Sequence, residues 1–348
     1  MIPITRRLWL LAVCSVLGCA QEIAPKVDEC VAAYTRDHRF MGSVLIARSG
    51  RVLVEKGYGM ADLELDVPNT PQTKFRLGSI TKQFTAAAIL QLEEQGKLSV
   101  NDPISKYFVE SPAAWKDITI HHLLTHTSGI PNYTDFPGFM ANETRKPLTV
   151  PLLIGLFESK PLDFEPGAKW KYSNSAYELL GYVIEKLSGV SYEDYLKQHI
   201  FDPLEMRSTG YDHAAPVIRN RASGYAVKNG QFENAPFLDM SIPYSAGALY
   251  STVDDLYRWD RALYTEKVLG RKAIEKMYTP FKNNYAYGWD VRETPRRQYA
   301  HGGGIFGFST FIIRYPADDA LIVVLSNIQE APAGKIAADL SAILFDGK

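Results

Sequence analysis

The chain has 348 residues, of which 46% are hydrophobic, so it is long enough to form one large domain or two smaller ones with buried cores. The 38 Lys and Arg residues nearly balance the 39 Asp and Glu residues, and the formal net charge is -1. This composition excludes a disordered or fibrous chain, and the balanced charge does not indicate a nucleic-acid partner.

Residues 1–20 have the layout of a secretory signal. Arg6 and Arg7 precede an apolar run over residues 8–18, and small residues follow. Ordinary cleavage after Ala20 would remove the segment, whereas Val16-Leu17-Gly18-Cys19 resembles a bacterial lipobox, in which a lipidated Cys19 would attach the protein to the membrane. We therefore expect an exported protein, periplasmic or secreted. We assign no catalytic role to Cys30, because a single free cysteine is most often a small buried side chain.

The N-terminal part of the mature chain predicts a helix over residues 26–36 and then two strands, over 42–48 and 51–58. Ser49-Gly50 between the strands is typical of a tight hairpin. A short strand over residues 75–77 leads into a helix, which we expect Gly96 to end in the left-handed conformation. No charged residue occurs between Gln83 and Leu92, and a helix that is apolar nearly all round is usually buried in a domain centre.

The rest of the chain first predicts helices and then strands. Helices are expected over residues 118–126, 150–159, 175–188 and 192–200, separated by turns rich in Pro and Gly. Beyond residue 245 a helix over 252–263 is followed by strands over 287–291, 298–300, 309–315 and 321–327 and by a final helix over 335–345. The fold class is therefore α/β (α+β). We expect one mixed antiparallel sheet built from both termini (residues 25–80 and 245–348) and flanked by helices, with an all-helical segment over about 97–240 inserted between them.

Three short polar motifs carry groups that could do chemistry. Ser79 and Lys82 lie three residues apart at the start of the buried helix, so they share a helical face and the ammonium can reach the hydroxyl. Tyr172-Ser173-Asn174 precedes the helix that begins near Ser175. His301-Gly302-Gly303-Gly304 is expected just after a strand, where glycines let backbone amides approach a ligand closely.

These motifs, in this order, resemble those of the serine β-lactamase / penicillin-binding protein family, in the branch of class C β-lactamases, D-alanyl-D-alanine carboxypeptidases and related esterases. The family's Ser-x-x-Lys matches Ser79 and Lys82, its Tyr-x-Asn matches Tyr172 and Asn174, and its Lys/His-x-Gly matches His301 and Gly303. The similarity extends over about residues 25–345. It implies a β-lactamase/transpeptidase-like fold in a single catalytic domain over 21–348.

The resemblance also implies roles for the matching residues. Ser79 would be the nucleophile, and Lys82 would serve as a base through a lowered pKa or would hold Tyr172 as a phenolate. Tyr172 would take the serine proton and return it to the leaving group, and the backbone N–H groups of Ser79 and Gly304 would form an oxyanion hole. Asn174 would orient Lys82 and bind the substrate amide. His301, with Gly303, would help bind a substrate carboxylate or hold Tyr172 in position.

Departures from the family pattern leave several functions open. His301 stands where most class C β-lactamases have lysine, so a carboxypeptidase or esterase acting on D-amino-acid peptides or esters is favoured over a class C-type β-lactamase. A non-catalytic relative that binds cell-wall peptides or self-assembles would be expected to lack one of the motif residues, and all are present.

Other chemistries have weaker signals. His122 and His126 have metal-compatible spacing without a His-Glu-x-x-His pattern, so we expect them to pack structurally and expect no metal or cofactor. The Gly-x-Ser-x-Gly elbow of the α/β-hydrolases is missing from the sequence.

Overall fold

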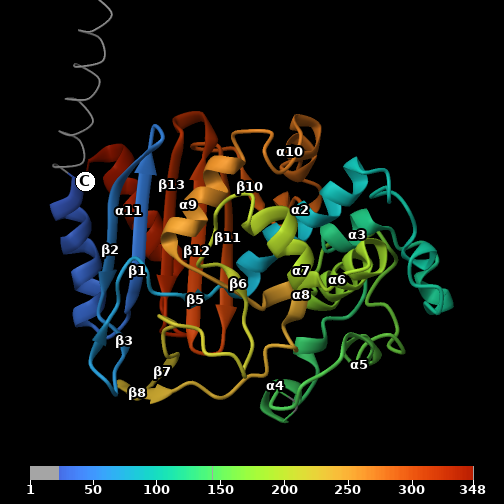
Figure 1. The fold of residues 1–348 in the computed structure, drawn as a ribbon, viewed down its shortest axis with the longest axis horizontal. Coiled ribbons are helices and arrows are strands. Elements are labelled where there is room, and N and C mark those ends of the chain that lie inside the picture. The colour runs from blue at the N-terminus through green and yellow to red at the C-terminus, as the bar shows by residue number, and fades with distance from the viewer. Residues whose placement is uncertain (1–22, 143, 348) are drawn as a thin grey trace, which may run out of the picture.

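The computed structural model describes residues 23–142 and 144–347, and a six-stranded antiparallel sheet forms its centre (Figure 1). The strand order is β10-β11-β12-β13-β1-β2. These strands are β1 (Gly42–Arg48), β2 (Arg51–Tyr58), β10 (Asp290–Arg292), β11 (Gln298–Ile305), β12 (Phe308–Tyr315) and β13 (Ala320–Ser326). Since β1 pairs with β2 on one side and β13 on the other, the prediction of a sheet built from both termini is confirmed. The expected signal, with Cys19, lies outside the described residues.

The hairpin between β1 and β2 has the predicted strands and turn. Ser49 and Gly50 have φ angles of 53° and 70°. Positive φ at both turn positions is the conformation of a type I′ turn, whose twist matches that of the two strands.

Side chains on alternate positions of the central strands enter two separate cores. Leu45 and Ala47 of β1 face one core, and Val44 and Ile46 face the other. The second core is covered by a helix over residues 23–36 and by α11 (Ala333–Asp346), which lie together on one side of the sheet in Figure 1. The sheet is therefore buried on both faces, and the larger core lies on the side that carries the remaining helices.

Helix α2 (Thr81–Glu94) runs through that larger core. Every residue from Thr81 to Leu92 is buried, as the uncharged stretch predicts, and Gly96 follows with φ 69°. The other α-helices are α3 (Ile120–Leu124), α4 (Phe139–Asn142), α5 (Val150–Gly155), α6 (Asn174–Ser188), α7 (Tyr192–Leu196), α8 (Tyr244–Gly247), α9 (Val253–Ala262) and α10 (Arg271–Met277). A π-helical turn over Lys197–Phe201 extends α7, and a 3-10 turn over Gly78–Ile80 precedes α2.

Seven further strands among the described residues are short, and of these only the strand expected over residues 75–77 was predicted from the sequence, as β5. They are β3 (Met60–Asp62), β4 (Val67–Pro68), β5 (Phe75–Arg76), β6 (Gly210–Tyr211), β7 (Tyr225–Lys228), β8 (Gln231–Asn234) and β9 (Leu249–Ser251). The prediction of an all-helical segment over 97–240 is therefore wrong: its helices are accompanied by β6 and the β7–β8 hairpin. β9 lies between β5 and β6 in a small sheet next to the start of α2.

Two predicted strand boundaries are wrong. β11 continues to Ile305, so His301-Gly302-Gly303-Gly304 lies within the strand and not after it. β10 begins at Asp290, because residues 287–289 form an irregular segment in which Gly288 has φ 76°. Glycine-rich sequence favours a loop on propensity alone, and pairing with β12 overrides that preference here.

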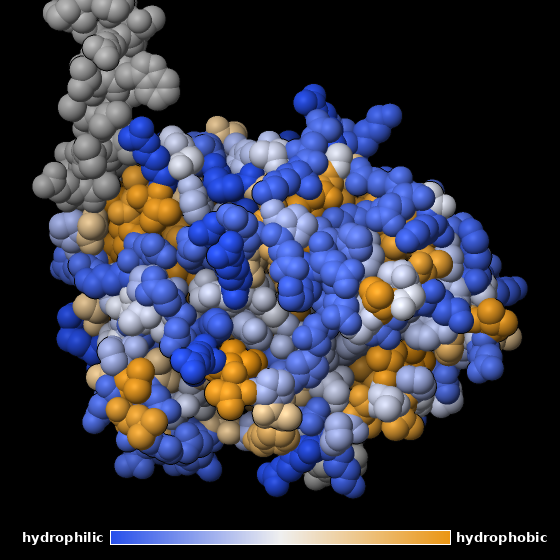
Figure 2. Space-filling model, viewed as in Figure 1, coloured by the Kyte–Doolittle hydropathy of each residue, from blue (hydrophilic) through white to orange (hydrophobic). Residues whose placement is uncertain are grey.

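The surface is mixed in character. On the face drawn in Figure 2, hydrophilic residues cover most of the area and hydrophobic residues form small separate patches. Among the described helices, not one has the length and apolarity that a membrane span requires.

Candidate active site

Ser79 lies in the 3-10 turn that joins β5 to α2. Gly78 before it has φ 55°, and a Cβ atom at Gly78 would lie 2.9 Å from the backbone nitrogen of Gly304. Glycine therefore lets the turn approach β11 closely enough to place Ser79 beside Gly304.

The Lys82 ammonium group contacts three oxygen atoms inside the protein. Its Nζ lies 3.0 Å from Ser79 Oγ, 2.8 Å from Asn174 Oδ1 and 2.9 Å from the Ala246 carbonyl oxygen. The predicted pair of Ser79 and Lys82 is thus brought together with Asn174 of the second motif. Ala246, in α8, is a partner that sequence reasoning did not identify.

Burial controls the charge of Lys82. Its side chain is fully buried, and this desolvation lowers the pKa to about 7; only an ionised Glu178 carboxylate would act in the opposite direction. A neutral amine has two protons and one lone pair. Because the Asn174 and Ala246 oxygens can only accept, the two protons satisfy them and the lone pair faces the Ser79 hydroxyl.

The Tyr172 ring lies 4.8 Å from Lys82 Nζ. Burial raises the pKa of Tyr172 above its usual value, and the Ser79 hydroxyl opposes that shift. Tyr172 therefore keeps its proton at neutral pH. Of the two bases that the sequence left open, these pKa directions favour neutral Lys82 over a Tyr172 phenolate.

His301 lies near Tyr172 but bonds to a different tyrosine. Its Nε2 is 2.9 Å from the Tyr285 hydroxyl, its Nδ1 is 2.6 Å from the Gly302 carbonyl oxygen, and its ring centroid is 6.5 Å from that of Tyr172. Burial, with the nearby Lys82 charge, lowers the pKa of His301 to about 4. The imidazole is therefore neutral at pH 7 and adds no fixed positive charge.

The glycines of β11 face the turn that carries Ser79. β10 pairs only with Gln298–Ala300 of β11, so the edge beyond Ala300 is left to the 3-10 turn. A Cβ atom at Gly303 would lie 1.9 Å from the Leu77 carbonyl oxygen, whereas one at Gly304 would meet no heavy atom within 4 Å. Gly303 thus permits close packing, and Gly304 faces open space.

A cavity of about 180 Å³ opens at this point. It is lined by the following residues: Gly78, Ser79, Tyr133, Thr134, Met140, Asn174, Leu238, Ile242, Pro243, Ala246, Gly247, Gly304, Ile305 and Phe306. Ser79 and Gly304, whose backbone N–H groups are the predicted oxyanion donors, both belong to the lining. A carbonyl group in this cavity would reach the Ser79 hydroxyl.

Three buried groups near Lys82 were not singled out as active-site residues from the sequence. Tyr285 bonds to His301, and the His126 ring packs 4.2 Å from that of Tyr172. Glu178 is fully buried, and burial raises its pKa well above the usual value. Only Glu178 had a sequence signal, because it follows Asn174 by four residues and so shares its helical face.

The histidines considered for metal binding have protein partners. His122 Nδ1 accepts from the Thr119 backbone N–H at 3.2 Å, and His126 Nδ1 accepts from that of Ser173 at 3.2 Å. Across residues 23–142 and 144–347, no group of three or more His, Cys, Asp or Glu side chains could hold a metal ion.

Comparisons with known proteins agree with this geometry. A family model described as Beta-lactamase matches residues 27–344. The Bacillus subtilis (strain 168) protein PbpX is 34% identical over 299 residues, which cover 86% of this chain and 73% of that protein.

Solved structures give the same result. The octameric penicillin-binding protein homologue from Pyrococcus abyssi superimposes with a TM-score of 0.82 at 30% identity, covering 92% of this chain and 77% of that one. A D-stereospecific amidohydrolase from Streptomyces sp. superimposes with a TM-score of 0.77 at 27% identity, and the match covers 92% of this chain and 98% of that one. A family match over nearly the whole described chain, supported by these relatives, shows that the protein belongs to the beta-lactamase family and is one of its serine hydrolases.

Proposed function

We propose that this serine hydrolase is exported and forms an acyl-enzyme on Ser79, acting on D-amino-acid peptides or carboxylic esters. The observation that carries the proposal is the position of Lys82 Nζ, 3.0 Å from Ser79 Oγ with its other two contacts on pure acceptors. The relatives named as penicillin-binding proteins and as a D-stereospecific amidohydrolase support this substrate class.

In the proposed mechanism, neutral Lys82 accepts the Ser79 proton as Oγ attacks the substrate carbonyl. The backbone N–H groups of Ser79 and Gly304 bind the oxyanion, and loss of one such donor typically costs about 2.7 to 4 kcal/mol of transition-state stabilisation. Tyr172 donates its hydroxyl proton to the leaving group and is reprotonated from Lys82. Water then attacks the acyl group and releases the acid, and the proton transfers run in reverse.

The neutral His301 argues against efficient turnover of β-lactams. A family member with lysine at this position would present a permanent charge to the substrate carboxylate, whereas burial holds the pKa of His301 at about 4. We therefore expect β-lactams to acylate Ser79 without rapid release. Steady turnover of a chromogenic cephalosporin would instead favour a β-lactamase.

The test compares the wild type with Ser79→Ala on D-Ala-D-Ala peptides, short p-nitrophenyl esters and β-lactams. Intact mass after treatment with a fluorophosphonate should show one adduct on the wild type and none on Ser79→Ala. If the wild type gained no adduct and the two proteins showed equal rates, a non-catalytic binding protein would be the better description.

Export is tested separately by the mass of the protein recovered from cell fractions. A mature chain beginning at Gln21 would indicate ordinary cleavage, and a diacylated chain beginning at Cys19 would indicate lipidation. An unprocessed chain retained in the cytoplasm would contradict export.

A further inference from the structure

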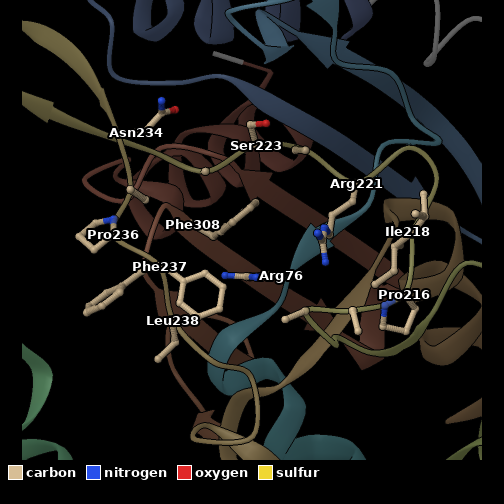
Figure 3. A pocket seen from close by; sticks show the side chains of 17 residues that line it. Arg76, Pro216, Ile218, Arg221, Ser223, Asn234, Pro236, Phe237, Leu238 and Phe308 are labelled. Atoms are coloured by element: carbon tan, nitrogen blue, oxygen red, sulfur yellow. The ribbon is translucent and has the colours of Figure 1, made fainter. Parts of the chain in front are cut away.

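A second, larger cavity adjoins the one that contains Ser79. Its volume is about 550 Å³, and it is formed by β5, by two loop segments over 214–224 and 234–238, and by the turn after β11 (Figure 3). Leu238 and Phe306 line both cavities. A substrate bound at Ser79 can therefore extend past these two side chains into the larger space.

Two arginines are the charged residues in the lining of this second cavity. Arg76 lies on β5, three residues before Ser79, and Arg221 lies on the facing loop; no Asp, Glu or Lys is among the described residues of the lining. Figure 3 shows both guanidinium groups inside the cavity, close to each other. The lining therefore carries positive charge alone.

A single buried carboxylate offsets only one of these two charges. Asp212 has a fully buried side chain and accepts from Arg76 Nε at 2.6 Å and from Arg221 Nη1 at 2.5 Å. Among the described residues, the two terminal nitrogens of Arg76 and Nη2 of Arg221 have no hydrogen-bond partner. Donors that Asp212 holds in place thus remain free to bind an anion.

The surroundings strengthen the attraction for an anion. The Arg76 side chain is only 15% exposed, and Phe308, Phe237 and Leu238 form apolar walls around it. Low polarity near a charge increases the strength of its ionic hydrogen bonds, and the planar guanidinium matches the two oxygens of a carboxylate.

The position along β11 shows which part of the substrate would reach the arginines. Tyr172, the proposed donor to the leaving group, lies on the His301 side of Gly304, whereas Phe306 lies on the opposite side. The second cavity therefore faces the acyl part of the substrate.

We propose that Arg76 and Arg221 bind a carboxylate carried by the acyl part of the substrate, at the end remote from the scissile bond. This inference rests on the proposed acylation of Ser79 and specifies the substrate: an acyl chain, peptidyl or aliphatic, with a free carboxylate beyond the catalytic cavity.

The test uses p-nitrophenyl monoesters of adipic and suberic acid, each compared with its analogue in which the second carboxyl is a methyl ester. For at least one chain length, we expect the free acid to have a kcat/KM about tenfold or more above that of the capped ester, the effect of one charge-assisted hydrogen bond. In Arg221→Gln the preference for the free acid over the capped ester should fall to about twofold or less, because the KM for the free acid rises. The kcat of this variant on the capped esters should stay unchanged, because Arg76 still pairs with Asp212.

Arg219→Gln is the matched control, since it removes the same charge from an exposed residue outside the lining. It should keep the full preference. Equal kcat/KM for free and capped esters in the wild type, or a preference that survives Arg221→Gln, would overturn the carboxylate site while leaving the proposed hydrolase intact. If Ser79→Ala matched the wild type on the capped esters, the proposed function would itself fail, and this inference with it.

Discussion

Lys82 Nζ lies 3.0 Å from Ser79 Oγ in a fully buried setting where the pKa of the amine is lowered to about 7. In the proposed mechanism this pair joins a proton acceptor directly to a nucleophile, without any histidine or carboxylate between them. Because desolvation is the main cause of the shift, the reactivity of Ser79 depends on the packing that excludes water from Lys82.

The first prediction concerns the pH dependence of hydrolysis. Since the neutral amine of Lys82 is the active form in the proposed mechanism, kcat/KM should rise with pH through a midpoint near 7 and stay high above about pH 8. The raised pKa of Tyr172 means that its ionisation should not lower the rate up to pH 9.5. Initial rates with a p-nitrophenyl ester between pH 5 and 9.5, corrected for the Ser79→Ala background, measure this profile. A rate independent of pH between 6 and 8 would contradict a lysine base.

Lys82→Ala should reduce kcat by about 10²- to 10⁴-fold, the usual contribution of a general base. The cavity left by the truncated side chain could destabilise the fold as well, so circular dichroism and thermal unfolding should accompany the kinetics. Activity within about threefold of the wild type in a folded variant would assign the base to another group.

The second prediction concerns Glu178, which we expect to be protonated. The Tyr133 hydroxyl lies 3.0 Å from Glu178 Oε1 and 2.7 Å from the Ile242 carbonyl oxygen. One hydroxyl has one proton, and the Ile242 oxygen can only accept it, so the contact with Glu178 is satisfied when the carboxyl donates. The raised pKa of Glu178 agrees with this assignment.

Glu178→Gln replaces one neutral hydrogen-bond donor by another, so no charge near Lys82 is lost. The midpoint of the pH profile should therefore stay within about 0.3 pH units of the wild-type midpoint. An ionised Glu178 would instead stabilise the charged lysine, and its removal would lower the midpoint. Glu178→Leu, which leaves the Tyr133 and Ser245 hydroxyls without this partner, should lower the free energy of unfolding by about 1 to 3 kcal/mol.

The third prediction concerns the close contact between β11 and the segment that leads into the 3-10 turn carrying Ser79. In Gly303→Ala the new methyl group would overlap the Leu77 carbonyl oxygen and lie 2.4 Å from Thr310 Oγ1. We expect a loss of about 1 to 3 kcal/mol in the free energy of unfolding. A displacement of Ser79 by about 1 Å would in addition lower kcat about 10²-fold.

Gly304→Ala is the control for stability. A methyl group there meets no heavy atom within 4 Å, so urea unfolding should change by less than about 0.5 kcal/mol. If Gly303→Ala were as stable and active as the wild type, the close approach of the two segments would not be required.

The fourth prediction concerns a buried ion pair remote from the cavities. Arg314 Nε on β12 donates to Asp260 Oδ1 on α9 at 2.9 Å, and both side chains are at most 2% exposed. Arg314→Ala should lower the free energy of unfolding by about 3 kcal/mol, because it leaves the Asp260 carboxylate in the core with Arg261 as its remaining partner. Arg258→Ala, at an exposed residue of α9, should lower the free energy of unfolding by less than about 1 kcal/mol. Equal midpoints of urea unfolding for the two variants would contradict this role.

Much of the architecture was predictable because it depends on local patterns. The β1–β2 hairpin follows from two alternating segments around Ser49-Gly50, and the burial of α2 follows from its uncharged stretch. The three motifs likewise indicated Ser79, Lys82, Tyr172, Asn174 and His301 as neighbours. The structure brings Lys82 Nζ against Ser79 and Asn174 and places the Tyr172 ring 4.8 Å from Nζ, whereas His301 bonds to Tyr285. The strand through Gly302–Gly304 was not predictable, because its pairing with β12 opposes the local preference of glycine.

Sequence alone therefore indicated which residues are candidates for chemistry and in what order, since the three-residue spacing of Ser79 and Lys82 is local to the turn and the first residues of α2. Tertiary structure decided their chemical state. The third oxygen on Lys82 comes from Ala246, 164 residues away, and the burial that lowers its pKa depends on segments packed from across the chain. The same holds for Arg76 and Arg221, which share Asp212 only because the fold brings β5 against a loop distant in sequence.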